Sequence, residues 1–290
     1  MVGSALTASL RVDGALVNHL IRNGGKASQG DVQWDPSTAT VDVAAMEGYD
    51  AVVHLSGASI GHGRWTDARK QVLRSSRIDT TRILVDSLAR LGQKPSVFVC
   101  ASATGYYGDR GDEILTEASD NGNDFVGLMS RSWEAEASRA ATNGIRTVIA
   151  RFGIILSPNR GALSAMVTPF KLGLGGRMGS GKQWMSWIAM EDVIAALRAA
   201  IVDKSWTGPV NLVAPNPVRN ADFVRVLASA LHRPAIFPVP AIALRLMLGE
   251  MADALLLSSQ RVIPQKLQAA GYRFHQEDLE AALRGILSNG

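Results

Sequence analysis

The chain has 290 residues, of which 47% are hydrophobic and 19% charged, and its 28 glycines follow no Gly-X-Y period. This composition supports a large packed core and excludes a collagenous or intrinsically disordered chain. The single cysteine, Cys100, excludes an internal disulfide framework and a cysteine-based zinc site.

The charge pattern does not indicate a nucleic-acid partner, because the net charge of +4 comes from scattered basic residues rather than from a block or stripe. Residues 1–14 lack the basic and then apolar segments that mark a signal peptide. No uninterrupted apolar stretch approaches the ~18 residues that span a bilayer. We therefore expect a cytoplasmic protein that binds a small-molecule substrate and has neither a nucleic-acid nor a membrane partner.

Strand-like and helix-like segments alternate along the first 233 residues. Short apolar runs typical of buried parallel strands occur at residues 15–21, 51–55, 97–101, 147–152 and 209–213. Helical spacing of apolar residues follows at residues 4–10, 66–91, 125–143, 162–172, 191–202 and 220–231. Asn220 is the expected N-cap of the last of these. The alternation predicts a doubly wound parallel sheet, an α/β fold of the Rossmann type.

The pattern changes after residue 233. Three prolines, Pro234, Pro238 and Pro240, interrupt the chain, and helical spacing then recurs at residues 244–257 and 277–287 with no strand between them. We expect two domains, residues 1–233 with the sheet and residues 234–290 as a small, mostly helical C-terminal lobe.

The start of the chain allows two interpretations. In an open parallel sheet, the first strand usually leads into a G-x-G-x-x-G turn that opens a helix. Here Met1-Val2-Gly3 precedes a helix and then a strand. Either a first strand and two of the three glycines are missing, with Gly3 as the last, or Met1 opens an ordinary surface helix.

Two segments are candidates for contact with a nucleotide. Arg22 follows the first predicted strand, where an arginine fits the 2′-phosphate of NADP, although a solvated charge at a strand end is the more common explanation. The small residues of Leu55-Ser56-Gly57-Ala58 follow the second strand and allow a close backbone approach, as would any tight turn.

The segment from Cys100 to Asp109 carries the candidate chemistry. A strand brings Ser102 to the carboxyl edge of the sheet, where ligands bind in open α/β folds. The Ser102 hydroxyl can donate to a substrate oxygen, and Tyr106 or Tyr107 can exchange a proton with that oxygen. The alternative is a turn with one capping serine and two packing tyrosines.

Other motifs are weaker. The glycine-rich residues 173–183 are not a P-loop, because Gln183 replaces the Ser or Thr that would contact Mg²⁺ and no strand precedes them. They can line a substrate cleft in which Arg177 or Lys182 meets an anionic substrate. The five histidines show no metal-ligand spacing, and His19 and His54, inside predicted strands, are expected in the core.

Several stretches together resemble one family. They are residues 51–60, 75–85, 102–109 (SATGYYGD), 133–137 (WEAEA), 151–157, 173–193 (with GSGKQWMSWI), 208–215 and 248–274 (with QRVIPQKL). In order and content they resemble the extended short-chain dehydrogenase/reductase superfamily, and within it a nucleoside-diphosphate-sugar epimerase-like family sometimes labelled cell-division-inhibitor-like. In that resemblance the N-terminal strand and most of the glycine motif are missing.

The resemblance implies roles residue by residue. Ser102 falls on the catalytic Ser/Thr and Gly3 on the last glycine of the nucleotide motif. The loop formed by Leu55, Ser56, Gly57 and Ala58 lies along the cofactor, with Arg77 and Thr81 beneath it. The resemblance also places Ala101 on the cofactor side of the site, and it places Lys182 and Trp184 on the substrate side.

Two departures from the family affect catalysis. No tyrosine lies between Phe125 and Ala137, where the Tyr-x-x-x-Lys pair is expected, and Arg131 is the basic residue there. Ala189 stands where relatives commonly carry histidine. Tyr106 or Tyr107 would then have to replace the missing tyrosine.

The resemblance implies an NAD(P)-dependent epimerase- or dehydratase-like oxidoreductase that prefers NADP(H), with NAD(H) possible, and acts on a nucleotide sugar or a small carbonyl or alcohol. The alternative is a non-catalytic NADP(H)-binding sensor or scaffold. The sequence leaves the substrate and the oligomeric state open.

Overall fold

The computed structural model describes residues 1–22, 25, 28–158 and 160–288. Its centre is a four-stranded, fully parallel sheet with the strand order β11-β7-β5-β4. These strands are β4 (Ala51–His54), β5 (Val97–Ala103), β7 (Arg146–Phe152) and β11 (Gly208–Leu212). They correspond to four of the predicted strands, so the parallel sheet is confirmed.

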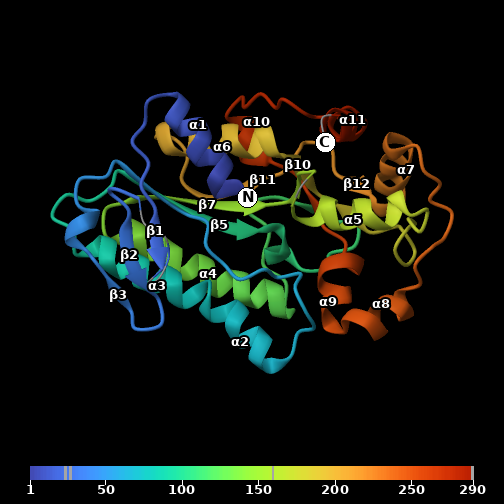
Figure 1. Cartoon of the computed structure of the whole chain (residues 1–290), viewed down its shortest axis with the longest axis horizontal. Coiled ribbons are helices and arrows are strands. Elements are labelled where there is room, and N and C mark those ends of the chain that lie inside the picture. The colour runs from blue at the N-terminus through green and yellow to red at the C-terminus, as the bar shows by residue number, and fades with distance from the viewer. Residues whose placement is uncertain (23–24, 26–27, 159, 289–290) are drawn as a thin grey trace.

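Helices cover both faces of this sheet (Figure 1). Helices α1 (Val2–Val12) and α6 (Met190–Val202) lie on one face, and α3 (Ile78–Ala89) and α4 (Phe125–Thr142) on the other. Successive residues of β5 alternate between the two, because side chains on a strand point to opposite faces: Val97 and Val99 pack toward α6, and Phe98 and Cys100 toward α3 and α4. The predicted doubly wound α/β architecture is confirmed.

The helix at residues 66–91 is in fact two helices. Thr66 caps α2 (Asp67–Ser75) by accepting a hydrogen bond from the Arg69 amide at 3.2 Å, and α3 begins only after Arg77. Apolar spacing continues across the junction at Ser76 and Arg77, which is why the sequence pattern does not show the break. The side chains of these two junction residues turn toward the loop after β4.

A second, smaller sheet lies beside the first. It contains β1 (Leu20–Arg22), β2 (Val32–Asp35) and β3 (Thr40–Val41), with β1 parallel to β2 and β3 antiparallel to it. The predicted strand at residues 15–21 was therefore too long. His19 was wrongly expected in the core: it is exposed, and its ring contacts Thr7 and Asp31. Within the described residues, β1 pairs only with β2, and β4 only with β5.

Short elements extend the molecule beyond the sheet (Figure 1). They are β6 (Ile114–Leu115), β8 (Ile154–Leu156), α5 (Ala162–Lys171), β9 (Trp184–Met185), β10 (Trp187–Ala189), β12 (Val218–Arg219) and α7 (Asn220–Leu231). Asn220 is not the N-cap of α7, because Arg219 holds that position. The Asn220 side chain instead accepts a hydrogen bond from the Met178 amide at 2.9 Å and so fixes the glycine-rich segment.

The C-terminal region is mostly helical, as expected, but it is not helix alone. It consists of α8 (Ala241–Leu248), α9 (Glu250–Ala252), a π-helical turn (Asp253–Leu257), β13 (Arg261–Val262), α10 (Gln265–Ala269) and α11 (Leu279–Ser288). The absence of a strand was wrongly predicted, since β13 pairs in parallel with β6. Leu283 of α11 packs against Leu227 of α7. The domain boundary at residue 233 stays a prediction. None of the helices in the described ranges is long and apolar enough to cross a membrane.

Candidate functional site

A cavity of about 590 Å³ opens at the carboxyl ends of β1 and β2, against the junction of α2 and α3. We call it the Arg22 cavity. Its lining residues are Arg22, Asp35, Pro36, Ser37, Val72, Ser75, Ser76, Asp79 and Thr80. Its size falls in the range of small-molecule sites, and it lies where open α/β sheets bind ligands.

The charges in this cavity differ in how far they are already neutralised. Arg22 is exposed and has no ion pair within the described residues. The Asp35 carboxylate accepts hydrogen bonds from the Ser37 amide at 2.8 Å and hydroxyl at 2.6 Å, which lower the pKa of Asp35. Asp79 pairs with Arg82 at 3.2 Å. Among the described residues that line it, the cavity therefore has one cation without an ion pair, Arg22, together with several hydroxyl groups.

The loop after β4 is attached to the wall of this cavity. The Ser76 hydroxyl, on the cavity side, accepts a hydrogen bond from the Ala58 amide at 3.0 Å, and Arg77 donates to the Ala58 carbonyl at 3.0 Å. A Cβ placed on Gly57 would lie 3.3 Å from the Arg77 guanidinium carbon, so the loop approaches that side chain closely. Arg77 thus braces the loop and is not one of the residues that line the cavity.

Two further predicted residues lie near the loop. A Cβ on Gly3, in the first turn of α1, would be 3.9 Å from a Leu55 methyl group, so the start of α1 and the loop are neighbours. Burial and the nearby Arg69 lower the pKa of Arg77 to about 10. Thr81, behind Arg77, accepts a hydrogen bond from the Trp133 indole at 2.9 Å. The structure therefore brings together Gly3, Leu55–Ala58 and Arg77, as the resemblance implied.

Ser102 lies in a buried polar network at the carboxyl ends of β5 and β7. Its hydroxyl donates to Glu134 of α4 at 2.6 Å, and Arg151 of β7 donates to both oxygens of Glu134 at 2.8 and 2.7 Å. The Arg151 and Glu134 side chains are only 2% and 8% exposed. The strand register brings the Ser102 and Arg151 side chains close together, because these two residues are paired neighbours on β5 and β7.

Tyr107 extends this network to β11. Its hydroxyl accepts a hydrogen bond from Arg151 at 2.9 Å and donates to Asn211 at 2.7 Å, and the Asn211 amide donates to the Ile263 carbonyl at 3.0 Å. Burial raises the pKa of Tyr107 to about 12. We call Ser102, Glu134, Arg151, Tyr107 and Asn211 the Ser102–Asn211 network. Tyr107 has no exposed surface, and this position does not support a role as proton donor to a substrate.

Tyr106 has a different environment. It is partly exposed, and the Arg151 guanidinium lies 3.6 Å from the centre of its ring. No described residue hydrogen-bonds the Tyr106 hydroxyl. Of the two tyrosines, the structure favours Tyr106 as the residue that can meet a ligand. Ala101, in contrast, is buried in the core between the sheet and α3.

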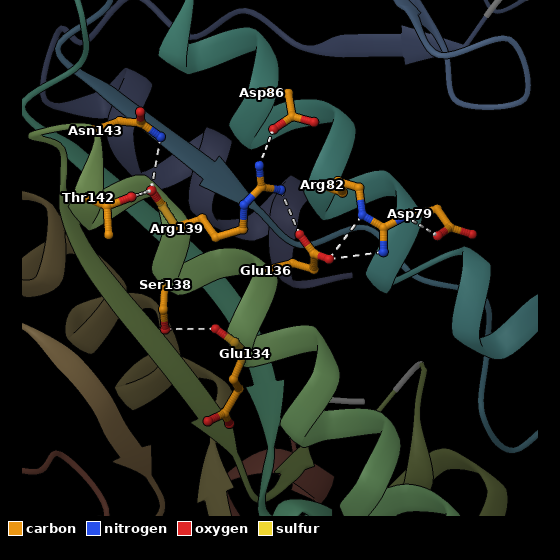
Figure 2. Close-up of polar contacts among 9 residues, drawn as sticks. All are labelled: Asp79, Arg82, Asp86, Glu134, Glu136, Ser138, Arg139, Thr142 and Asn143. Carbon is orange, nitrogen blue, oxygen red and sulfur yellow. Dashed lines mark hydrogen bonds and ion pairs between the residues drawn. The ribbon is translucent and has the colours of Figure 1, made fainter.

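Helix α4 directs two glutamates to different neighbours (Figure 2). The Glu134 carboxylate points toward the sheet, whereas the Glu136 carboxylate points to Arg82 of α3 at 2.9 Å and to Arg139 at 2.8 Å. The helix has no tyrosine, and its Arg131 is exposed. The cation nearest to the candidate catalytic residues therefore comes from β7, as Arg151, and not from α4.

Lys182 and Trp184, the predicted substrate-side residues, neither line the Arg22 cavity nor belong to the Ser102–Asn211 network. Lys182 is exposed, and its carbonyl accepts a hydrogen bond from Arg219. Trp184 lies between Arg219 and Arg261, whose guanidinium carbons are 4.2 and 4.5 Å from its ring centre, and its indole donates to Asp112 at 3.0 Å. The Trp184 ring is thus occupied by neighbours of its own chain, and the substrate role of both residues stays a prediction.

Several residues in these regions were missed from the sequence. Arg151 and Asn211 carried a signal, because a charged or amide side chain inside an apolar strand must be paired when buried. Glu134 had none, since a helical glutamate is usually solvent-exposed. The hydroxyl residues of the Arg22 cavity come from separate segments and become recognisable only in three dimensions.

The chain matches two family models. Residues 1–212 match the NAD dependent epimerase/dehydratase family, and residues 239–286 match a domain of unknown function, DUF1731. Among curated proteins, it is 41% identical to the epimerase family protein Mb2239 of Mycobacterium bovis, covering 98% of this chain and 93% of that protein.

Two solved structures are also similar along the whole chain. The human epimerase family protein SDR39U1 (isoform 2), crystallised with NADPH, is 31% identical with a TM-score of 0.90, covering 100% of this chain and 97% of that one. The nucleoside-diphosphate sugar epimerase from Corynebacterium glutamicum is 35% identical with a TM-score of 0.82, covering 100% of this chain and 56% of that one. With its parallel sheet flanked by helices, the chain belongs to the NAD-dependent epimerase/dehydratase family.

Proposed function

We propose that this protein is an NADP(H)-dependent oxidoreductase whose cofactor binds with its adenosine 2′-phosphate in the Arg22 cavity. The observation that carries the proposal is Arg22, which has no ion pair among the described residues and lines the cavity together with Ser37, Ser75, Ser76 and Thr80. A guanidinium matches phosphate in charge and geometry. The four hydroxyls already donate within the chain, to Asp35 and to backbone carbonyls, so the proposed phosphate contact rests on Arg22. The human SDR39U1 protein, whose crystal structure contains NADPH, supports the choice of cofactor.

The remaining cofactor contacts follow from the same surroundings. Pro36 and Val72 give the Arg22 cavity an apolar wall suited to the adenine ring, and Asp35 can accept a hydrogen bond from the adenine amino group. The first turn of α1, beside Leu55, presents free backbone N–H groups that suit the pyrophosphate. Asp79 opposes a bound phosphate by charge, so the preference for NADP(H) depends on Arg22.

When bound, NADP(H) supplies or accepts a hydride. In this proposal the Tyr106 hydroxyl exchanges the matching proton with the substrate oxygen, because it is partly exposed and has no partner among the described residues. Ser102 could donate to the same oxygen only after its hydroxyl leaves Glu134. A nucleotide sugar or a small carbonyl or alcohol is the proposed substrate class. The nucleoside-diphosphate sugar epimerase from C. glutamicum supports the first of these.

One observation favours a second candidate, a non-catalytic NADP(H)-binding sensor or scaffold. The Ser102 hydroxyl is already bound to Glu134, Tyr107 is fully buried and α4 carries no tyrosine. Such a protein would bind the cofactor without turning it over.

The first measurement tests the cofactor assignment, which both candidates share. NADPH and NADH affinities are measured for the wild type and for Arg22→Gln, which we expect to weaken NADPH binding about 30-fold and leave NADH binding unchanged, since a hydrogen bond to a charged group contributes about 2 kcal/mol. Equal losses for both cofactors would overturn the cofactor assignment.

Turnover is then followed by NADPH absorbance with nucleotide-sugar and carbonyl panels, for the wild type and for Tyr106→Phe. The oxidoreductase proposal expects turnover that falls at least about 100-fold in Tyr106→Phe, the lower bound typical of a lost proton-transfer group. Tight NADPH binding without turnover by the wild type would favour the sensor or scaffold.

A further inference from the structure

Half of the exposed large apolar side chains among the described residues come from two segments of the chain. Among the described residues, 14 large hydrophobic side chains are exposed, and seven of them come from only two segments, residues 172–174 and 236–247. We call these seven the apolar face. Its members are Leu172, Leu174, Ile236, Phe237, Ile242, Leu246 and Met247, each between 58% and 73% exposed. A concentration of this kind marks an interaction surface, whereas single exposed apolar residues do not.

Backbone hydrogen bonds hold the glycine-rich residues that follow Leu174 against the second segment. The Val239 amide donates to the Arg177 carbonyl, and the Gly179 amide donates to the Val239 carbonyl, both at 2.9 Å. A Cβ on Gly176 would lie 1.7 Å from the Phe237 carbonyl oxygen, so only glycine allows this approach. The geometry is therefore held by the glycine-rich segment that the sequence singled out and the proposed reaction does not use.

Helix α8, which follows directly, presents its apolar residues outward. Ile242 and Leu246 are one helical turn apart and exposed, whereas Leu244 is buried beneath them. In Figure 1 the helix lies at the lower right edge of the molecule, away from the central sheet. Arg245, also on this helix, pairs with Asp253 at 2.9 Å and so adds little free charge.

A cation-lined cavity adjoins the apolar face. It has a volume of about 270 Å³, lies between α7 and residues 235–238, and contains Arg177 and Arg225 together with Val224, Ala228, Ile236 and Pro238. Arg225 has only the exposed Asp222 at 3.4 Å as its ionic partner. Lys171, next to Leu172, is exposed, and the described residues provide no ion pair for it or for Arg177.

These charges decide between two possible occupants. A symmetric contact with a second copy would set each apolar face against itself and bring the two sets of cations together, which is unfavourable. A bilayer with anionic headgroups accepts the apolar side chains at its interface and offers phosphates to the arginines. We propose that the apolar face and this cavity bind the surface of an anionic phospholipid membrane, whereas the sequence led us to expect no membrane partner.

The test measures sedimentation of the full chain with vesicles of phosphatidylcholine alone and of equal parts phosphatidylcholine and phosphatidylglycerol. We expect binding to the mixed vesicles that weakens with added salt. Arg177→Gln/Arg225→Gln should reduce it about 25-fold, since each basic residue near an anionic surface contributes about fivefold. Ile242→Ser/Leu246→Ser should reduce it at least about tenfold through lost apolar burial.

The matched control is Val12→Ser/Leu16→Ser, which changes two side chains that are 87% and 84% exposed but lie outside the apolar face. It should bind vesicles like the wild type, and circular dichroism checks that every variant is folded.

Absence of wild-type binding, or an equal loss in the control, would overturn the proposal. So would a wild-type dimer in light scattering that Ile242→Ser/Leu246→Ser converts to a monomer, since the occupant would then be a second copy. NADPH binding should be unchanged in all three variants, so this proposal can fail independently of the proposed activity.

Discussion

The Ser102–Asn211 network and the Arg22 cavity contain the same kinds of side chain, but their arginines differ in burial and in hydrogen bonding. Each places one arginine among hydroxyl groups at the carboxyl ends of parallel strands. In the network, three nitrogens of Arg151 donate to protein acceptors, and the side chain is almost fully buried. Arg22 is exposed and has no ion pair among the described residues.

We interpret this difference as one between a structural site and a proposed binding site. A buried arginine whose hydrogen bonds are already made cannot turn to a ligand without leaving Glu134 as an unpaired buried charge. An exposed arginine loses little by binding a phosphate, because it only exchanges water for the ligand. Residue type and position at the sheet edge are thus insufficient to identify a catalytic group, and the number of unused hydrogen-bonding groups is the better guide.

The largest expected effect comes from breaking the network at its centre. Arg151→Met leaves Glu134 buried without a cation, so we expect the free energy of unfolding to fall by about 3–5 kcal/mol. Denaturant titration at neutral pH measures the change. Glu134→Leu/Arg151→Met, which removes both charges, should recover much of the loss.

An exposed arginine on the same layer of the molecule is the control. Arg139 pairs with Glu136 and Asp86 on the outer side of α3 and α4 (Figure 2), and Arg139→Met should cost less than about 1 kcal/mol. Similar losses for Arg151→Met and Arg139→Met would mean that the network does not depend on burial as we argue.

Burial gives the next effect, at His54. This residue, the last of β4, is buried between Trp34 and Phe98, its Nε2 has no hydrogen-bond partner among the described residues, and burial lowers its pKa from 6.5 to about 4. The folded protein favours the neutral His54 ring. The contribution of this preference to the free energy of unfolding is therefore fully present above pH 6.5 and is lost as the pH falls toward 4. The loss amounts to about 3 kcal/mol. His54→Phe should remove this part of the pH dependence, as denaturation at pH 7, 5.5 and 4.5 would show; parallel profiles for the two proteins would contradict it.

Tyr106 and Tyr107 allow a partly exposed and a buried side chain to be compared at adjacent positions. Tyr107→Phe deletes the hydroxyl that joins Arg151 to Asn211, and we expect a loss of about 1–2 kcal/mol in the free energy of unfolding. Tyr106→Phe removes a hydroxyl without a partner among the described residues, so stability should change by less than about 0.5 kcal/mol. Thermal denaturation of both variants tests the assignment, and equal destabilisation would place Tyr106 in the network as well.

Much of the fold was predictable because burial leaves a pattern in the sequence. The runs at residues 51–55, 97–101, 147–152 and 209–213 are apolar since both faces of a central parallel strand are covered. The strand at residues 15–21 was predicted too long because its first residues are apolar yet exposed, with Leu16 at the surface. Short pairs such as β6 with β13 have no periodicity to detect, because two residues form no repeat.

The candidate site was predictable in position but not in role. The sequence placed Arg22, Leu55–Ala58 and Ser102 at the carboxyl edge of a sheet, and the structure confirms that edge for each. It could not show that Ser102 faces Glu134, because that contact joins a strand to a helix 32 residues later in the chain. The same limit applies to the Arg22 cavity, whose two walls come from the ends of β1 and β2 and from the junction of α2 and α3.

The smallest effect tests the charge balance of the Arg22 cavity. Asp79 lines it and opposes a bound 2′-phosphate, so Asp79→Asn should strengthen NADPH binding a few-fold, on the order of 1 kcal/mol or less for an exposed charge, and leave NADH binding unchanged. Asp86→Asn is the matched control, since Asp86 lies on the same helix, is similarly exposed and pairs with Arg139 outside the cavity. Titrations at low and high salt provide the measurement. If both variants strengthened NADPH binding equally, the gain would reflect net charge alone, and the 2′-phosphate would have to be placed away from Asp79.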